Sequence, residues 1–253
     1  MNLLRDTWII FQRYMGQLLR EPAWVVIQIV QPLIYLLLFA PLLTSIATSP
    51  GFPPGGAYNV FVPGLLIQLG LFGASTVGFG LIAELRLGVV ERMRVTPVSR
   101  LALLIGRALK DIVTILVQAI IIVLLSLPFG LSIHPTGMLI ILGLLALISL
   151  FFASISYALG LWLKSENSFA PLTFTATLPL LLLSGVLLPL SLAPAWLRAI
   201  TAVNPLSYAV DASRAIFNDH LGDPSVIKGV AIMAVLAVIA VVIAARSFNR
   251  AVA

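Results

Sequence analysis

The feature that most constrains this chain is a series of six long apolar runs separated by short polar segments. A helix rises about 1.5 Å per residue, so about 20 apolar residues cross the roughly 30 Å of hydrocarbon in a bilayer. Each run reaches about that length, whereas helices of soluble proteins are usually shorter and carry a polar face. The runs predict an all-α, polytopic membrane protein with six transmembrane helices, at residues 23–43, 60–83, 112–131, 137–163, 169–190 and 226–245.

The composition agrees with this class. Only 9% of the residues are charged and 60% are hydrophobic, against about 25% charged residues in an average soluble protein. The six runs occupy most of the 253 residues, so we expect a single transmembrane domain over residues 1–253. The net charge of +6 does not indicate nucleic-acid binding, because the basic residues form no run or stripe. The absence of cysteine excludes disulfides and thiol chemistry.

The basic residues alternate between the two sides of the predicted bundle. The positive-inside rule places Lys- and Arg-rich loops in the cytoplasm. We therefore expect both termini and residues 84–111 on the cytoplasmic side of a plasma membrane, the inner membrane in a bacterium. Twelve of the fifteen basic residues fall on that side, namely Arg5, Arg13, Arg20, Arg86, Arg92, Arg94, Arg100, Arg107, Lys110, Lys164, Arg246 and Arg250.

Residues 1–22 are interrupted by charges and do not resemble a cleaved signal peptide. Their pattern predicts an amphipathic interface helix that lies along the cytoplasmic surface and ends at Pro22. A simple extension of the first span is the alternative. The apolar positions recur at helical spacing, at Leu4, Trp8, Phe11, Met15 and Leu18.

Motifs of enzymes are missing from the sequence: it has no phosphate-binding loop, no nucleophile elbow and no H-E-x-x-H zinc motif. None of the six runs has His, Asp or Glu near its middle, which argues against an intramembrane protease and weakens ion-coupled transport. Gly70, Ala74 and Gly78 recur every four residues and indicate close helix packing, inside the subunit or against a second copy. The runs also hold uncharged polar residues, most of which we interpret as packing contacts: Gln28, Gln31, Gln68, Ser75, Thr76, Gln118, Ser149, Ser154, Thr173, Thr175 and Thr177.

The segment from Glu84 to Arg100 is charged, lies between the second and third runs, and is too short to be a domain. Leu87, Val90 and Met93 are spaced to form one apolar edge of a short helix, which Pro97 would end. The alternative is a solvated basic loop that only sets the topology.

This segment is similar to the cytoplasmic coupling helix of type-2 ATP-binding-cassette exporter permeases of the daunorubicin-resistance kind. Their pattern is E-x-x-G-x-x-E-x-x-x-x-T-P-[VI]-[SR]-R, and this chain supplies Gly88, Glu91, Thr96, Pro97, Val98, Ser99 and Arg100 at that spacing. Glu84 stands one residue further from Gly88 than the first Glu of the pattern. A second match, L-S-G-V-L-L-P, then P-A-W-L, then N-P-L-S-Y-A-V-D-A-S-R within residues 183–214, resembles the outer segment before that family's last span. The two motifs occur in the family's order, so the resemblance covers nearly the whole chain.

The resemblance implies a transport subunit rather than an enzyme. Two copies of such a chain dock on two cytoplasmic ATPase subunits, which bind the ATP and Mg that this chain has no site for. It further implies a coupling helix at residues 84–100, whose coupling residues are Glu84, Gly88, Glu91, Arg92, Arg94, Thr96 and Pro97.

In the family, short re-entrant helices close the outer mouth, which here implies an outer helical segment at residues 191–214. Pro179, Gly185 and Pro189 interrupt the fifth run, as either a re-entrant element or ordinary kinking would do. Because the first and fifth spans form the family's subunit interface, the resemblance favours an internal contact for the small residues of the second span. The implied gate residues are Gly185, Pro189, Trp196, Asn204 and Pro205.

The cargo and its binding residues are not identified by the sequence, and neither a cofactor nor a metal site is expected in the chain itself. Members of the family move drugs, lipids and lipid-linked glycans, and the apolar spans favour an amphiphile that leaves the cytoplasm. We expect contacts with membrane lipid and none with nucleic acid. The alternative is an ATP-independent secondary transporter or channel, which an obligate ATPase partner would exclude.

Overall fold

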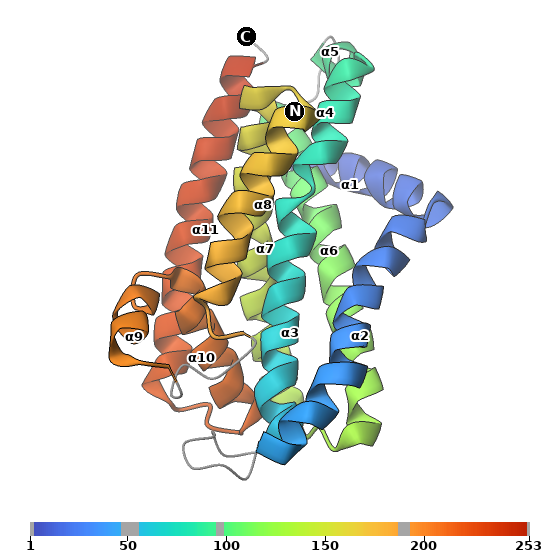
Figure 1. Ribbon diagram of the computed structural model, residues 1–253. Coiled ribbons are helices and arrows are strands. Elements are labelled where there is room, and N and C mark those ends of the chain that lie inside the picture. Colours follow the sequence, from blue (N-terminus) through green and yellow to red (C-terminus); the bar gives the residue numbers. More distant parts are fainter. Residues whose placement is uncertain (1–2, 47–55, 95–98, 187–192, 252–253) are drawn as a thin grey trace.

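The computed structural model describes residues 3–46, 56–94, 99–186 and 193–251, and the all-α prediction is confirmed for these residues (Figure 1). Long helices run side by side along one axis, and shorter helices lie at the two ends of the bundle. In chain order the elements are α1 (Leu3–Arg20), α2 (Ala23–Ile46), α3 (Gly56–Ser75), α4 (Gly78–Arg86), α5 (Val89–Arg94), α6 (Arg100–Ser126), the 3-10 turn η1 (Leu127–Phe129), α7 (Pro135–Leu163), α8 (Glu166–Leu182), α9 (Ala195–Thr201), α10 (Pro205–Phe217) and α11 (Pro224–Ala251).

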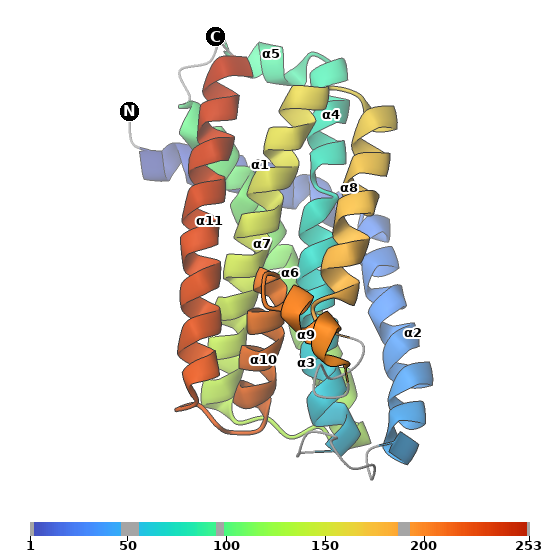
Figure 2. The same cartoon turned by 60° about the vertical axis from the view of Figure 1, so that its left-hand side comes forward.

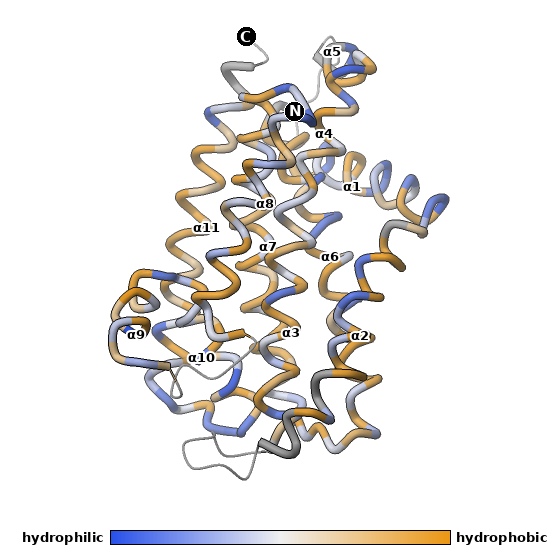
Figure 3. The backbone as a smooth tube through the Cα atoms, in the orientation of Figure 1, coloured by the Kyte–Doolittle hydropathy of each residue, from blue (hydrophilic) through white to orange (hydrophobic). Residues whose placement is uncertain are grey.

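Helix α3 is the centre of the bundle. It packs against α2, α6, α7, α8 and α10, and nearly all of its side chains are buried. A helix that is apolar on all sides is typical of a protein core or a membrane span, and α3 is covered mainly by its neighbours. Hydrophobic residues dominate the length of α7 and α11, while hydrophilic residues gather in α1 and around the two ends of the bundle (Figure 3).

Glycines of the second predicted span let neighbouring helices approach α3 and α4. A Cβ atom on Gly70 would lie 3.2 Å from Ile148 of α7, and one on Gly73 would lie 3.3 Å from Ile115 of α6. At Gly78 an added Cβ would lie 2.5 Å from the ring of Phe169. The small residues of this span therefore pack inside the subunit.

The second predicted span is not one continuous helix, because it breaks between α3 and α4. The hydroxyl group of Ser156, on α7, donates to the carbonyl of Ser75 at 2.7 Å and accepts from the backbone N–H of Gly78 at 2.8 Å. It thus satisfies two backbone groups that the break releases, as irregular backbone inside an apolar bundle requires. The break is invisible in the sequence because the partner side chain comes from another helix.

Among the described residues, four helical stretches are long and apolar enough to cross a membrane: Gly56–Arg86, Leu101–Phe129, Pro135–Leu163 and Pro224–Phe248. A fifth is present if α1 and α2 together form one broken span. The third predicted span begins earlier than expected, because α6 starts at Arg100 instead of residue 112. The fifth is shorter than the predicted 169–190, since α8 ends at Leu182.

Helix α1 meets α2 at a bend of 69°, so the two do not form one straight helix. It lies across one end of the bundle and packs on α6, where Ile10 fits against Gly106. The predicted apolar face stays exposed at Leu4 and Trp8, as an interface helix requires. Both termini lie toward the same end of the bundle as α5, and α9 and α10 lie toward the other end (Figure 2).

Candidate functional site

The predicted coupling helix is divided into two helices by a tight turn. Helix α4 ends at Arg86, and Gly88 adopts a left-handed conformation with φ of 65° before α5 begins. Glycine adopts this conformation without strain, which explains its place at the turn. The expectation of one helix from Glu84 onward was therefore wrong: Glu84 belongs to the end of the broken second span, and α5 is a separate six-residue helix.

The predicted coupling residues fall in different parts of this turn. Arg92 is exposed on α5, and its guanidinium group donates to the carbonyl groups of Leu87 at 2.9 Å and Gly88 at 3.3 Å. Both carbonyls belong to the turn between α4 and α5, and that of Gly88 also accepts from the backbone N–H of Arg92 at 3.1 Å. The backbone of α5 carries Glu91 and Arg94, whereas Thr96 and Pro97 lie outside the described residues. Of the predicted apolar edge, Val90 is buried but Leu87 is exposed.

Glu84 faces the inside of the subunit and joins three helices. Its carboxylate accepts a hydrogen bond from the hydroxyl of Tyr14 on α1 at 2.9 Å and forms an ion pair with Arg107 on α6. The guanidinium group of Arg107 also lies over the Tyr14 ring, 4.6 Å from its centroid, a geometry that favours a cation. Through Glu84, the helix that leads into α5 is tied to α1 and α6.

One helical turn further along α6, a second ion pair is buried. Asp111 is 3% exposed, pairs with Lys110 and accepts a hydrogen bond from the hydroxyl of Tyr157 on α7. We call Glu84, Arg107, Lys110 and Asp111 the buried charge cluster. Its two cations and two anions balance, as charges in a low-dielectric interior must.

The sequence analysis missed this cluster, because it placed Arg107, Lys110 and Asp111 in a cytoplasmic loop. The structure places them on α6, where Arg107 is only 4% exposed. A signal was present: the spacing of three and four residues puts the three side chains on one face of a helix. That face pairs with Tyr14, Glu84 and Tyr157, which are far away in the sequence and could not be predicted as partners.

An exposed ion pair joins α4 to the start of α8. Arg86 and Glu166 approach to 3.0 Å, with about half of each side chain in solvent, at 53% and 41% exposure. Exposed pairs of this kind contribute about 1 kcal/mol or less to stability. The pair nevertheless shows that α4 contacts α8 beside the turn that leads into α5.

At the opposite end of the bundle, Asn204 and Pro205 start helix α10. The Asn204 side chain accepts from the backbone N–H of Leu206 at 3.0 Å and so acts as the N-cap. Its amide nitrogen donates to the carbonyl of Leu180 at 2.8 Å, near the end of α8. One residue therefore begins α10 and satisfies a free carbonyl at the end of α8.

Gly185 follows α8 in a left-handed conformation with φ of 78°. Its carbonyl accepts from the guanidinium group of Arg214 on α10 at 2.7 Å, and the same group donates to the carbonyl of Val60 on α3 at 3.2 Å. Helix α10 is not among the candidate spanning helices. Burial lowers the pKa of Arg214 to about 10, so the guanidinium group stays charged at neutral pH. Arg214 therefore holds α3, α10 and the segment after α8 together.

The remaining predicted gate residues occupy separate places. Trp196 lies on α9 and is 65% exposed, and Pro189 lies outside the described residues. The structure brings Asn204, Pro205 and Gly185 to one end of the bundle through α8 and α10, while Trp196 points away from the core. No group of acidic, His or Cys side chains that could hold a metal ion is present among the described residues.

Several apolar helices long enough to span a bilayer, with buried charges that are ion-paired or hydrogen-bonded, define a multi-pass membrane protein. The chain belongs to the ABC-2 type transporter family, whose model matches residues 5–218. It is therefore a permease subunit of an ABC transporter, a class in which a separate partner carries the ATPase and hence the ATP and Mg.

Proteins similar to this chain include two transport permeases named ycf38 and one daunorubicin resistance permease. The transport permease ycf38 of Pyropia yezoensis is 30% identical over 220 residues, which cover 86% of this chain and 75% of that protein. The ycf38 permease of Cyanophora paradoxa is 28% identical over 217 residues, covering 85% and 75%. The daunorubicin resistance ABC transporter permease protein DrrB1 of Streptomyces coeruleorubidus is 26% identical over 212 residues, covering 79% and 71%.

Proposed function

We propose that this chain is one of two identical permease subunits that export an amphiphilic cargo from the cytoplasm, driven by two separate ATPase subunits. The observation that carries the proposal is the turn between α4 and α5. It places the charged helix α5 at the end of the bundle where both termini lie. Glu84, on the α4 helix that leads into α5, binds α1 and α6.

The proposed topology has six spans, with α2 and α8 added to the four helical stretches that meet the length criterion. Helix α2 has 24 residues, and α8 with 17 residues is about 26 Å long. Both termini and α5 then face the cytoplasm of a bacterial inner membrane or an equivalent plasma membrane, in agreement with the positive-inside rule. Helices α9 and α10 form the outer gate at the other end.

The proposed mechanism transmits a rigid-body movement. Closure of the ATPase pair displaces α5, to which Glu91, Arg92 and Arg94 belong. The compact turn at Gly88, braced by Arg92, passes this displacement to α4. The ion pair between Glu84 and Arg107 passes it on to α6, and the hydrogen bond from Tyr14 passes it to α1.

Co-expression with each ATP-binding-cassette ATPase of the source organism that lacks a membrane domain tests this proposal. We expect one such ATPase to co-purify in a complex of two permease and two ATPase chains by native mass spectrometry. The purified permease alone should not hydrolyse ATP, and the complex should do so in proteoliposomes. Cargo movement by the permease alone, without any ATPase, would instead favour a secondary transporter or channel.

A further inference from the structure

A groove of about 490 Å³ runs along the side of the bundle, between α11 and the segment that joins α9 to α10. Val203, Pro205 and Tyr208 form one wall, and Ala231, Ile232 and Val235 of α11 line the other. Val203 and Val235 are exposed, so the groove opens to the outside of the subunit. In a bilayer an acyl chain that fills such a groove gains the dispersion contacts that a void would forfeit.

A lysine lies next to this groove. Helices α10 and α11 approach closely at Gly229, where an added Cβ would lie 2.6 Å from the carbonyl oxygen of Tyr208. The adjacent residue, Lys228, places its ammonium nitrogen 4.5 Å from the centroid of the Tyr208 ring. Because the same ring lines the groove, a positive charge adjoins an apolar surface.

The charge of Lys228 is not neutralised within the subunit. The residue is exposed and pairs with no carboxylate among the described residues. Lys110 and Arg107, by contrast, both form ion pairs inside the bundle. A lysine ammonium group carries three donors and no acceptor. The site next to the groove therefore favours an anion with acceptor oxygens.

The spacing along α11 matches the layout of a phospholipid. Lys228 lies about 6 Å from the start of the candidate span at Pro224, and Val235 lies about 10 Å deeper along the helix. A long lysine side chain near the end of a spanning helix extends to the headgroup level. The ammonium group is thus close to the headgroup phosphates, and the groove lies at the depth of the acyl chains.

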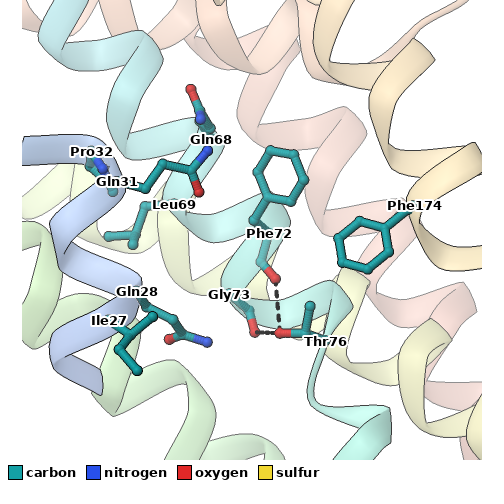
Figure 4. A pocket seen from close by; sticks show the side chains of 10 residues that line it. All are labelled: Ile27, Gln28, Gln31, Pro32, Gln68, Leu69, Phe72, Gly73, Thr76 and Phe174. Carbon is teal, nitrogen blue, oxygen red and sulfur yellow. Dashed lines mark hydrogen bonds between the residues drawn. The ribbon is translucent and has the colours of Figure 1, made fainter. Parts of the chain in front are cut away.

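The groove is separate from the interior cavity of about 180 Å³ between α2, α3 and α8. Figure 4 shows that cavity, which is lined by the side chains of Gln28, Gln31 and Gln68 and by the rings of Phe72 and Phe174. No described residue lines both the cavity and the groove. A ligand in the groove therefore lies on the lipid-facing side of the bundle and leaves its interior empty.

We propose that the groove between α10 and α11 binds an anionic phospholipid from the leaflet on the α9 and α10 side of the membrane. The headgroup phosphate accepts hydrogen bonds from Lys228, and one acyl chain lies along Val203 and Val235. A zwitterionic phospholipid has the same chains but no net charge to attract the lysine. The lipid joins the α9–α10 segment to α11 as a resident component and not as cargo, so the inference does not depend on the proposed export function.

Photolabelling of the full-length chain in phospholipid vesicles tests the groove. The probes are a phosphatidylglycerol and a phosphatidylcholine that carry the same diazirine-labelled acyl chain, each at the same low mole fraction. We expect the phosphatidylglycerol to label residues 203–208 and 231–236 about 5-fold more than the phosphatidylcholine. One lysine at a membrane surface contributes about that much to the binding of anionic lipid.

The variant Lys228→Gln keeps the length of the side chain nearly unchanged but removes its charge. It should label equally with the two probes in the groove. Arg246→Gln removes a positive charge from an exposed position near the other end of the same helix. This control should keep the wild-type preference for phosphatidylglycerol at residues 203–208 and 231–236.

The variant Ala231→Trp fills the groove from an exposed position, so it should fold normally. It should reduce the labelling of residues 203–208 by both probes. Val242→Trp, at an exposed position on α11 outside the groove, is the matched control and should label like the wild type. The thermal unfolding temperature of each variant, measured alongside, shows that it is folded.

Equal labelling of the groove by the two probes in the wild type, or an unchanged preference in Lys228→Gln, would overturn the inference. Loss of self-association in Ala231→Trp with no change in labelling would also overturn it, because a second copy of the chain would then cover the groove. The experiment needs neither an ATPase nor a cargo, so its failure leaves the proposed export function standing.

Discussion

The hydroxyl group of Ser156 lies 2.8 Å from the backbone nitrogen of Gly78 and accepts its hydrogen bond where the second span breaks. The same hydroxyl donates to the carbonyl of Ser75 at 2.7 Å. One side chain of α7 therefore replaces part of the hydrogen bonding that the break removes from the span. The segment between this break and the turn at Gly88 is α4, which leads into α5.

Replacing Ser156 with Ala should leave a buried N–H and a buried carbonyl without that partner. We expect a loss of about 1–3 kcal/mol in the free energy of unfolding, measured as a lower thermal unfolding temperature of the purified subunit. Ser149→Ala is a matched control, because Ser149 lies buried on the same helix and its hydroxyl has no hydrogen-bond partner among the described residues. An equal loss in both variants would show that the bridge at the break is not the cause.

Replacing Glu84 with Gln should destabilise the subunit far more than Glu166→Gln. The first change leaves the guanidinium group of Arg107, which is 4% exposed, without its partner on α4, at a cost of about 3 kcal/mol or more. The second removes only the exposed pair with Arg86, worth about 1 kcal/mol or less. Chemical or thermal unfolding in detergent, with membrane abundance as a second readout, compares the two. Similar losses would contradict the separation into a buried and an exposed pair.

Reversing the charge of Arg92 should impair coupling and leave the permease inserted. Arg92 is exposed on α5, so its contribution to folding is small, whereas an interface charge left unpaired costs roughly 2–5 kcal/mol of binding. Arg92→Glu should therefore reach normal abundance but bind its ATPase about 30-fold more weakly or worse. The control is Arg246→Glu, at an exposed position near the end of α11. Full ATPase binding and transport by Arg92→Glu would show that α5 only sets the topology and does not couple to the ATPase.

Single cysteines in this naturally cysteine-free chain test the orientation. A membrane-impermeant maleimide added to intact cells should label Ser132→Cys, between η1 and α7, and should not label Ser165→Cys, before α8. Both should react once the membrane is dissolved, which shows that each thiol is reachable. The reverse labelling pattern would invert the proposed topology and place α5 on the outer side of the membrane.

The class of the fold followed from the sequence because it depends on the length and apolarity of each segment, which are local properties. The bilayer requires every spanning segment to satisfy its own backbone, so long apolar runs predict helices before any contact is known. The start of α10 at Asn204 and Pro205 is local in the same way, since an N-cap acts on the residues that follow it directly. The family motif in residues 84–100 also lies in one continuous stretch.

The tertiary structure decided the features that depend on partners far away in the chain. Arg107 and Asp111 resemble loop charges in the sequence, yet both are buried on α6. Glu84 on α4 neutralises Arg107, and Tyr157 on α7 donates a hydrogen bond to Asp111. Arg214 is likewise buried, and it donates a hydrogen bond to the carbonyl of Gly185. A charge enters an apolar bundle only where a partner offsets its lost hydration. Which residues become partners is set by the packing of helices that lie tens of residues apart, so composition and spacing along the chain cannot reveal it.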